Sequence, residues 1–386
     1  MAAKQDIEMI CVDCGQEFEF TLGEQWFYIS KNLTPPRRCR TCRDKRKQAA
    51  KLKQQAADAR DLDALRKKFE EIESHDISCD AASTLYIIGN GFDLMHDVPS
   101  SYWHFRNSIG RNNPLRYALD KYLNVKEWWS DFEEALAHLN VGKMRNDLTV
   151  DMRLDVFDAY SPEAKASDFF MAAETVMEPA NIITRELPRR FRMWVEGLSV
   201  PTSARPLKDL IFDGKVLCFN YTEFIEDLYG VSHGNVCYIH GCRKKQKGQP
   251  KEELILGHRP VWEYDGEQSP KAVKHLHTGK KGALLDAAYD TTINYLNWYD
   301  EATTKDCASI IRNHQSFFDS LHSIKQIVVI GHSMAPVDWD YFMEVHRHCP
   351  DADWYIGYHG VNDLKNCEKL SAKLGIDPRR IAIFKT

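Results

Sequence analysis

The clearest chemistry in the sequence is carried by two cysteine pairs near the start of the chain. Cys11 and Cys14 form one CxxC pair, Cys39 and Cys42 form the second, and 24 residues separate them. A CxxC turn places two thiolates side by side, and two such turns supply the four sulfur ligands of a closed tetrahedral zinc site. The spacing therefore predicts a structural Zn²⁺ bound by these four cysteines in a small β zinc ribbon over residues 1–43.

Basic residues are concentrated beside the second cysteine pair. Ten lysines and arginines lie between Lys31 and Lys53 against one acid, Asp44, although the whole chain has a formal charge of −5. Such a cluster suits contact with a nucleic acid or with another partner. Alternatively, the zinc only holds together a domain too small to form a core. The residues leave both interpretations open.

A second set of polar residues follows short apolar runs in the rest of the chain. Because ligands bind at the carboxyl ends of parallel strands, we expect these residues to share one site. A Gly-x-Gly turn among them would let backbone N–H groups approach a phosphate. In chain order the set comprises Gly89, Asn90, Gly91, Phe92, Asp93, Asn220, His240, Gly331, His332, Ser333 and Asp338.

The apolar runs themselves indicate the fold. Nearly continuous apolar strands that alternate with helices are typical of a parallel sheet with helices on both faces. We therefore predict an α/β domain over residues 84–386, with a helical insertion at about 114–200. The predicted strands are 85–88, 216–219, 236–239, 253–256, 326–330, 354–358 and 381–384.

Residues 44–83 connect the two parts. They are rich in charge, contain no glycine or proline, and place Leu62, Leu65, Phe69 and Ile72 at helical spacing. This pattern predicts a charged helical linker. The linker would serve either as a solvated spacer or as a short dimerising coiled coil, since two heptads are marginal for a coiled coil alone.

The apolar content excludes two classes of protein. No run reaches the roughly 20 apolar residues that span a bilayer, and the N-terminus lacks the pattern of a signal peptide. We therefore expect a cytoplasmic protein without membrane contact. Its eleven cysteines would be reduced thiols or metal ligands rather than disulfides.

The motifs of the large domain resemble, in order, those of the AbiH family of bacterial phage abortive-infection proteins. These motifs are IIGNGFDLMHDVPSSY, WWSDFEEAL, CFNYTEFIEDLYG, IHG, LILGH and IGHSMAPVDWDYF. AbiH proteins in turn look like distant relatives of the sirtuin fold, which implies a Rossmann-like (sirtuin-like) sheet that binds a nucleotide. Pro99 also matches the sirtuin pattern, whereas Asp93 and Asp97 depart from it and put the identity of the nucleotide in question.

The resemblance implies NAD as the substrate, cleaved at the nicotinamide–ribose bond. His240 would accept a proton and Asn220 would hold a ribose hydroxyl or the attacking water. His332 and His96 are alternative bases. The other residues that the resemblance assigns to nucleotide binding are Gly89, Asn90, Gly91, Phe92, Asp93, Pro99, Gly331, His332, Ser333 and Asp338, with Ser333 and Asp338 at the adenosine half.

The function expected from these features is an antiphage effector that binds and hydrolyses NAD. Because such an activity is toxic, we expect it to be restrained until a phage-derived or nucleic-acid trigger at the zinc ribbon, or homo-oligomerisation, activates it. Two alternatives stay open. One is a nuclease that the zinc ribbon guides to nucleic acid, which would show strict Mg²⁺ dependence. The other is a sensor that binds a nucleotide and signals without catalysis.

Overall fold

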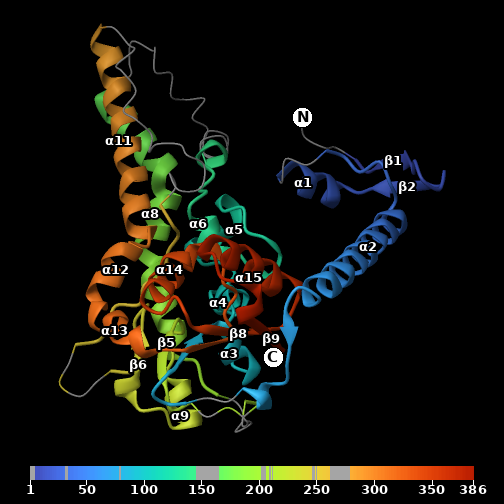
Figure 1. Cartoon of the computed structure of the whole chain (residues 1–386). Helices are drawn as coiled ribbons and strands as arrows, with labels where there is room; N and C mark the ends of the chain where they lie inside the picture. The colour runs from blue at the N-terminus through green and yellow to red at the C-terminus, as the bar shows by residue number, and fades with distance from the viewer. Residues whose placement is uncertain are drawn as a thin grey trace. The chain divides into compact units, whose positions relative to one another are not determined.

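The chain folds into two compact units, Met1–Lys67 and Lys68–Thr386. Figure 1 shows the computed structural model of the chain. It describes every residue except 1–4, 31–33, 78–79, 145–164, 201–205, 208–209, 211, 246–247, 249 and 261–278. Among the described helices, none has the length and apolar character needed to cross a membrane.

The small unit is a β-hairpin followed by two helices. Strand β1 (Ile7–Ile10) pairs antiparallel with β2 (Glu17–Phe20), and helices α1 (Leu22–Ser30) and α2 (Arg40–Arg66) follow. The predicted β module thus also carries helices. The helix expected across the linker begins inside the cysteine module and ends at Arg66.

The large unit is built on one seven-stranded sheet in which every strand pair is parallel, as the apolar runs predict. The strands are β3 (Glu70–Glu71), β4 (Thr84–Ile88), β5 (Lys215–Cys218), β6 (Val236–Tyr238), β7 (Gln326–Ile330), β8 (Asp353–Tyr358) and β9 (Ile381–Lys385).

The strand order is β3-β9-β8-β7-β4-β5-β6. Apart from the short edge strand β3, this is the Rossmann order 3-2-1-4-5-6, in which the direction of winding reverses between the first and fourth strands. Here the reversal lies between β4 and β7, which are direct neighbours. All five residues of β4 are buried, so both faces of the sheet are covered there. The predicted α/β class is confirmed.

Two details of the sheet differ from the predictions. The predicted strand at 253–256 is wrong: this segment has no regular structure and contacts the sheet end through the Ile255 N–H, which donates to the His240 carbonyl at 2.9 Å. Strand β3, by contrast, lies within the predicted linker and pairs with β9. Glu70 and Glu71 have no apolar alternation, which is why the pattern hid this edge strand.

Helices fill the connections between strands. The β4–β5 connection carries α3 (Asn90–Met95), α4 (Tyr102–Ser108), α5 (Pro114–Tyr122), α6 (Phe132–Leu136) and α8 (Ala166–Glu196). The later connections carry α9 (Phe224–Tyr229), α11 (Gly279–Thr303), α12 (Cys307–Asn313), α13 (Gln315–Asp319), α14 (Trp339–His348) and α15 (Val361–Leu374).

The two long helices α8 and α11 run alongside each other, although they come from different connections (Figure 1). Helices α5, α6 and α8 occupy the stretch where an insertion was predicted; its residues 145–164 lie outside the described part of the chain. A helical core forms between them from buried residues such as Phe105, Phe132 and Phe191. This layer brings side chains of both connections to the carboxyl ends of the strands.

Candidate functional site

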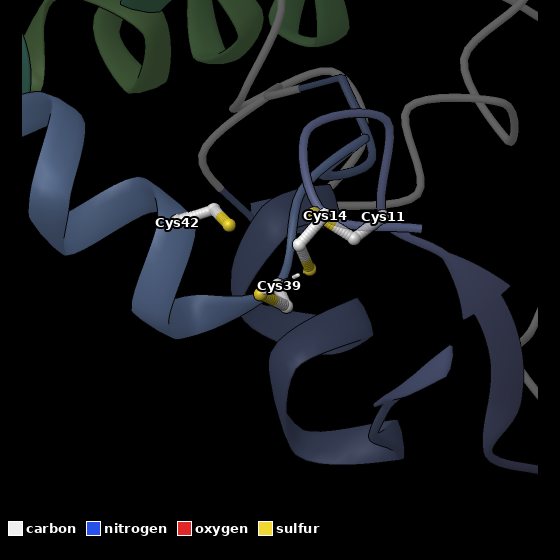
Figure 2. Close-up of side chains that lie close together, drawn as sticks. All are labelled: Cys11, Cys14, Cys39 and Cys42. Carbon is white, nitrogen blue, oxygen red and sulfur yellow. Dashed lines mark hydrogen bonds between the residues drawn. The ribbon is translucent and has the colours of Figure 1, made fainter. Parts of the chain in front are cut away.

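The four predicted zinc ligands converge in the small unit. Figure 2 shows the side chains of Cys11, Cys14, Cys39 and Cys42 gathered together, and their sulfur atoms all lie within 4.8 Å of one another. The Sγ atoms of Cys14 and Cys39 are 3.8 Å apart. Tetrahedral zinc with Zn–S bonds of about 2.3 Å separates its sulfurs by about 3.8 Å. The donor set and its spacing therefore fit a structural zinc site.

Backbone and charge hold the two cysteine pairs together. Gly15 follows Cys14 at φ +72°, and its N–H donates to the Cys11 carbonyl at 2.9 Å, which closes the first turn. Between those cysteines, Asp13 accepts hydrogen bonds from Arg38 Nε at 2.9 Å and from Arg46 Nε at 2.8 Å. Two arginines of the predicted basic cluster, Arg46 on α2 and Arg38 just before it, thus contact the turn of the hairpin.

In the large unit, glycines bring two loops together where the winding reverses. The Gly91 N–H, in the first turn of α3 after β4, donates to the carbonyl of Gly331 in the loop after β7, at 2.7 Å. A Cβ on Gly89 would lie 2.6 Å from the His332 Cα, and one on Gly91 would lie 2.7 Å from the Gly331 Cα. This packing accounts for the Gly-x-Gly turn, and it places the following residues next to the end of β5.

Asp93, in the first turn of α3, points at the residues that follow β5. Its carboxylate accepts from Asn220 Nδ2 at 2.8 Å and from the Thr222 hydroxyl at 2.6 Å. Asp93 is only 2% exposed. The Asn220 side chain is therefore fixed through its amide nitrogen, while its buried Oδ1 has no hydrogen-bond partner among the described residues. Asp93 thus orients Asn220 and leaves an acceptor available.

Asp93 makes the stability of the protein sensitive to pH. Burial raises its pKa to about 7, although the hydrogen bonds from Thr222 and Asn220 oppose this. A carboxyl whose pKa is raised on folding contributes stability below its unfolded pKa, near 4, and loses it as the pH rises toward 7. The free energy of unfolding should fall by about 1.4 kcal/mol per pH unit from this group across that window.

Asp93→Asn should remove this dependence, because an amide does not ionise. Its amide oxygen can accept from Asn220 Nδ2, and its amide nitrogen can donate to the Thr222 hydroxyl. We expect its melting temperature to fall less than that of the parent protein as the pH rises from 5 to 8. Scanning calorimetry at four pH values would measure this. Asp97→Asn, at an exposed carboxyl in the next turn of chain, serves as the control. Parallel curves for the parent and Asp93→Asn would contradict the assignment.

Beside His240 lies a buried group of charged side chains. Lys305 Nζ is 2.7 Å from Glu133 Oε2 and 3.4 Å from Asp338 Oδ1. His240 Nε2 lies 3.8 Å from the same Asp338 oxygen, and the Tyr102 hydroxyl donates to the other Glu133 oxygen. Lys305 is 1% exposed. Burying ions costs several kcal/mol each even when they pair, so such a cluster is a candidate for function.

Asp338 is held in this cluster at the expense of a helix cap. It precedes α14 at the position where an aspartate commonly caps a helix, yet its side chain makes no capping bond. Burial alone would raise the pKa of Asp338, but the Lys305 charge and the hydrogen bond from His332 outweigh it and hold the pKa below its ordinary range. Burial also opposes the charge of Lys305, but Asp338 and Glu133 raise its pKa. Both groups are therefore ionised.

Of the three candidate bases, only His240 has a buried ring nitrogen without a hydrogen-bond partner among the described residues, Nε2. The ring also hydrogen-bonds the Phe219 backbone. This bond raises the pKa of His240, so the backbone carbonyl accepts and the ring donates, and Nδ1 must be the donor because Nε2 has no partner in the described part of the chain. Nδ1 therefore carries the ring proton and Nε2 the lone pair. Burial, followed by the Lys305 charge, holds the pKa of His240 well below its ordinary value, so the ring is neutral at neutral pH.

The other two histidines are occupied. His96 Nδ1 is 2.7 Å from the Phe92 carbonyl and its Nε2 is 2.9 Å from the Tyr229 hydroxyl. His332 Nδ1 accepts from the Met334 N–H at 2.9 Å, so the ring proton lies on Nε2, 3.4 Å from Asp338 Oδ2. His96 is thus a core residue, and His332 supports Asp338.

The LILGH motif positions Lys305. Gly257 lacks a side chain because a Cβ there would lie 2.3 Å from the Thr303 carbonyl oxygen. His258 N–H donates to that carbonyl at 2.9 Å, and the Lys305 N–H donates to the His258 carbonyl at 2.7 Å. The His258 Nε2 also contacts the Thr303 hydroxyl at 3.1 Å. The motif therefore clamps the end of α11 so that Lys305 enters the site.

The predicted site residues separate into two groups. Asp93, Asn220, His240, His332 and Asp338 are buried at the strand ends, with the polar contacts described above. The remaining ones are Phe92, which packs in the core under the sheet, Gly89, Gly91 and Gly331, which join the two loops, and Asn90, Pro99 and Ser333, which are exposed. The sequence interpretation missed Tyr102, Glu133, Thr222 and Lys305.

Comparison with protein families yields two matches. Residues 5–51 match a family model described as a probable treble clef domain, in agreement with the hairpin and helix that present the four cysteines. Residues 85–358 match the model described as bacteriophage abortive infection AbiH. No curated protein and no solved structure matches the chain. The match covers strands β4 to β8 from Leu85 onward and every polar residue of the site, and the chain belongs to the AbiH family of bacteriophage abortive infection proteins.

Proposed function

We propose that the large unit is the effector of an abortive-infection response and hydrolyses NAD at its nicotinamide–ribose bond. Family membership implies the role in phage abortive infection; the reaction is our inference from the site. The observation that carries it is a pair of buried acceptors without partners among the described residues, Asn220 Oδ1 and His240 Nε2. They follow neighbouring strands of the sheet.

Two orphan acceptors require a ligand that brings two donors, because a buried polar atom without a partner costs about 1–3 kcal/mol. The hydroxyls of a ribose are such donors, and so is a water held beside one. The carboxyl ends of strands next to the reversal of winding are where a Rossmann sheet binds nucleotides. A nucleoside ribose at Asn220 and His240 satisfies both conditions.

The proposed reaction needs a base at the ribose and no covalent enzyme intermediate. Water adds its oxygen to the anomeric carbon while the bond from that carbon to nicotinamide breaks, and the bonding pair leaves with nicotinamide as a neutral base. His240 Nε2 accepts the proton that the water loses, which solvent then takes up. The products are ADP-ribose, nicotinamide and one proton. Asp338 and His332 would orient the His240 ring and the attacking water. This role for Asp338 differs from the contact with the adenosine half that the sequence resemblance implies.

Release of nicotinamide by the full-length protein tests this function. We expect chromatography to show equal amounts of nicotinamide and ADP-ribose, and His240→Ala to reduce the rate by about 100-fold or more. Asn220→Ala should also abolish most of the activity. His322→Ala, at an exposed histidine, is the matched control and should act like the parent. Absence of release by the parent, with and without phage lysate, would refute the proposal.

Lys305 weighs against the nuclease alternative. A two-metal nuclease holds its cations between carboxylates. Here the space between Glu133 and Asp338 is filled by an ammonium group that contacts both. The sensor alternative makes a different forecast, since His240→Ala would then leave phage defence intact while Gly91→Asp would abolish it.

We also propose that the small unit binds nucleic acid as the sensing arm. Trp26 and Phe27 on α1 are 58% and 54% exposed, which suits stacking on unpaired bases. On α2, Arg40, Lys47 and Lys51 are exposed and recur at helical spacing, so they share one face. Exposed aromatic rings with a basic face are typical of proteins that bind single strands.

Replacing Arg40, Lys47 and Lys51 with glutamine should weaken binding to a labelled single-stranded oligonucleotide. The slope of log K against log salt should become shallower by about 2, because each lost phosphate contact removes about 0.7. Fluorescence anisotropy over a salt series would measure both effects. Lys67→Gln, at the far end of α2, is the control. Parent protein that binds no oligonucleotide at low salt would contradict this role.

A further inference from the structure

The buried cluster at the site has an unbalanced charge. Lys305 contributes one positive charge, and Glu133 and Asp338 contribute two negative charges within 3.4 Å of it. His332 is neutral because its Nδ1 accepts a hydrogen bond from the Met334 N–H. His240 is neutral because burial and the Lys305 charge hold its pKa well below its ordinary value. Among the described residues that contact this cluster, the net charge is therefore negative by one unit.

A polar side chain without a partner faces this charge. The imidazole of His240 is 3% exposed, and its Nε2 lone pair lies 3.8 Å from Asp338 Oδ1. Two electron-rich atoms so close together in a buried site repel each other unless a donor or a positive centre lies between them. A ligand that places a hydrogen-bond donor or a positive charge at this point is therefore favoured, and one that places a negative charge there is disfavoured.

We propose that Lys305, Glu133 and Asp338 form a cation-selective subsite, which takes an N-glycoside whose ring is a positively charged pyridinium and rejects the neutral dihydropyridine. This inference rests on the proposed function and adds to it a substrate class. The negative charge favours the oxidised dinucleotide in the ground state. It also favours the ribose as positive charge develops on it during bond cleavage.

Within this subsite each residue has a distinct part. Lys305 is a positioning residue that holds two carboxylates together, which would otherwise repel each other. Glu133 supplies the surplus negative charge, and the Tyr102 hydroxyl fixes its second oxygen. Glu134, the next residue of α6, is a natural control, because its side chain is 48% exposed and lies beside Lys126 at 3.9 Å.

Calorimetric titration of three ligands tests the proposal. NAD⁺, NADH and ADP-ribose would be added to full-length protein with His240→Ala, which should consume NAD⁺ about 100-fold more slowly than the parent. These ligands share the adenosine half and differ at the group that the subsite would contact. We expect NAD⁺ to bind about tenfold or more tightly than the other two.

Variants of the cluster then identify the source of the preference. Glu133→Gln should reduce the affinity for NAD⁺ to that for NADH and leave NADH unchanged, whereas Glu133→Asp and Glu134→Gln should keep the preference. Equal affinity for NAD⁺ and NADH in the starting protein would overturn the subsite and leave the proposed NAD site standing. So would equal weakening of both ligands by Glu133→Gln. If none of the three ligands binds, the proposed function fails and the subsite with it.

Discussion

Gly331→Ala is expected to destabilise the large unit strongly. Gly331 has φ +62°, where a side chain costs about 1–2 kcal/mol. In addition, a Cβ there would lie 2.1 Å from the Phe92 nitrogen and 2.5 Å from the Gly91 carbonyl carbon. Neither backbone atom can move without breaking the contact between the loops after β4 and β7.

The expected loss is about 4 kcal/mol, which should lower the melting temperature of a unit of this size by about 6 °C or more. Gly375→Ala separates the two causes, because Gly375 also has a positive φ, +71°, but has no atom within 4 Å of the added Cβ. That variant should lose only about 1 kcal/mol. Tryptophan fluorescence reports on the correct unit, since eight of the nine tryptophans lie beyond Lys67. Equal losses in both variants would show that the loops adapt.

The same loops show why so much of the fold could be predicted. The buried strands contain short apolar runs, such as 85–88, and a glycine or a polar residue follows soon after each run. In a parallel sheet covered on both faces, length and apolar content are enough to identify such strands. The segment 253–256 passed this test wrongly, because Leu254 is buried beside the sheet without joining its ladder.

The charged half of the site could not be predicted in this way. Glu133 and Lys305 come from two different helical connections and are 172 residues apart in the chain. A lone lysine after a helix is ordinarily exposed, and nothing local distinguishes Lys305 from such a residue. The available signal was indirect: WWSDFEEAL contains Glu133, and LILGH contains the Gly257 and His258 that hold the backbone at Lys305.

Zinc removal is expected to unfold the small unit while the large unit keeps its melting temperature. The hairpin and its helices have almost no apolar core of their own. Among the described residues of this unit, the large buried apolar side chains are Phe20 and Leu65, and the zinc ligand Cys11 is buried with them. Structural zinc in such modules contributes about 10–16 kcal/mol of binding free energy, which is also folding free energy. Loss of the metal therefore exceeds what the remaining contacts can offset.

We expect the purified protein to contain one zinc ion per chain by elemental analysis, and Cys42→Ser to lose most of it. Hydrogen exchange should then accelerate at β1 and β2, whose paired backbone groups would open, and stay slow at β4 and β7. Cys349→Ala, at a buried cysteine outside the cluster, should retain the metal. The reaction proposed for the large unit uses none of these cysteines, so we expect Cys42→Ser to keep NAD hydrolysis and to lose oligonucleotide binding. That result would separate the effector unit from the unit that senses its trigger. Slow exchange at β1 in metal-free protein would instead mean that the hairpin folds by side-chain contacts alone.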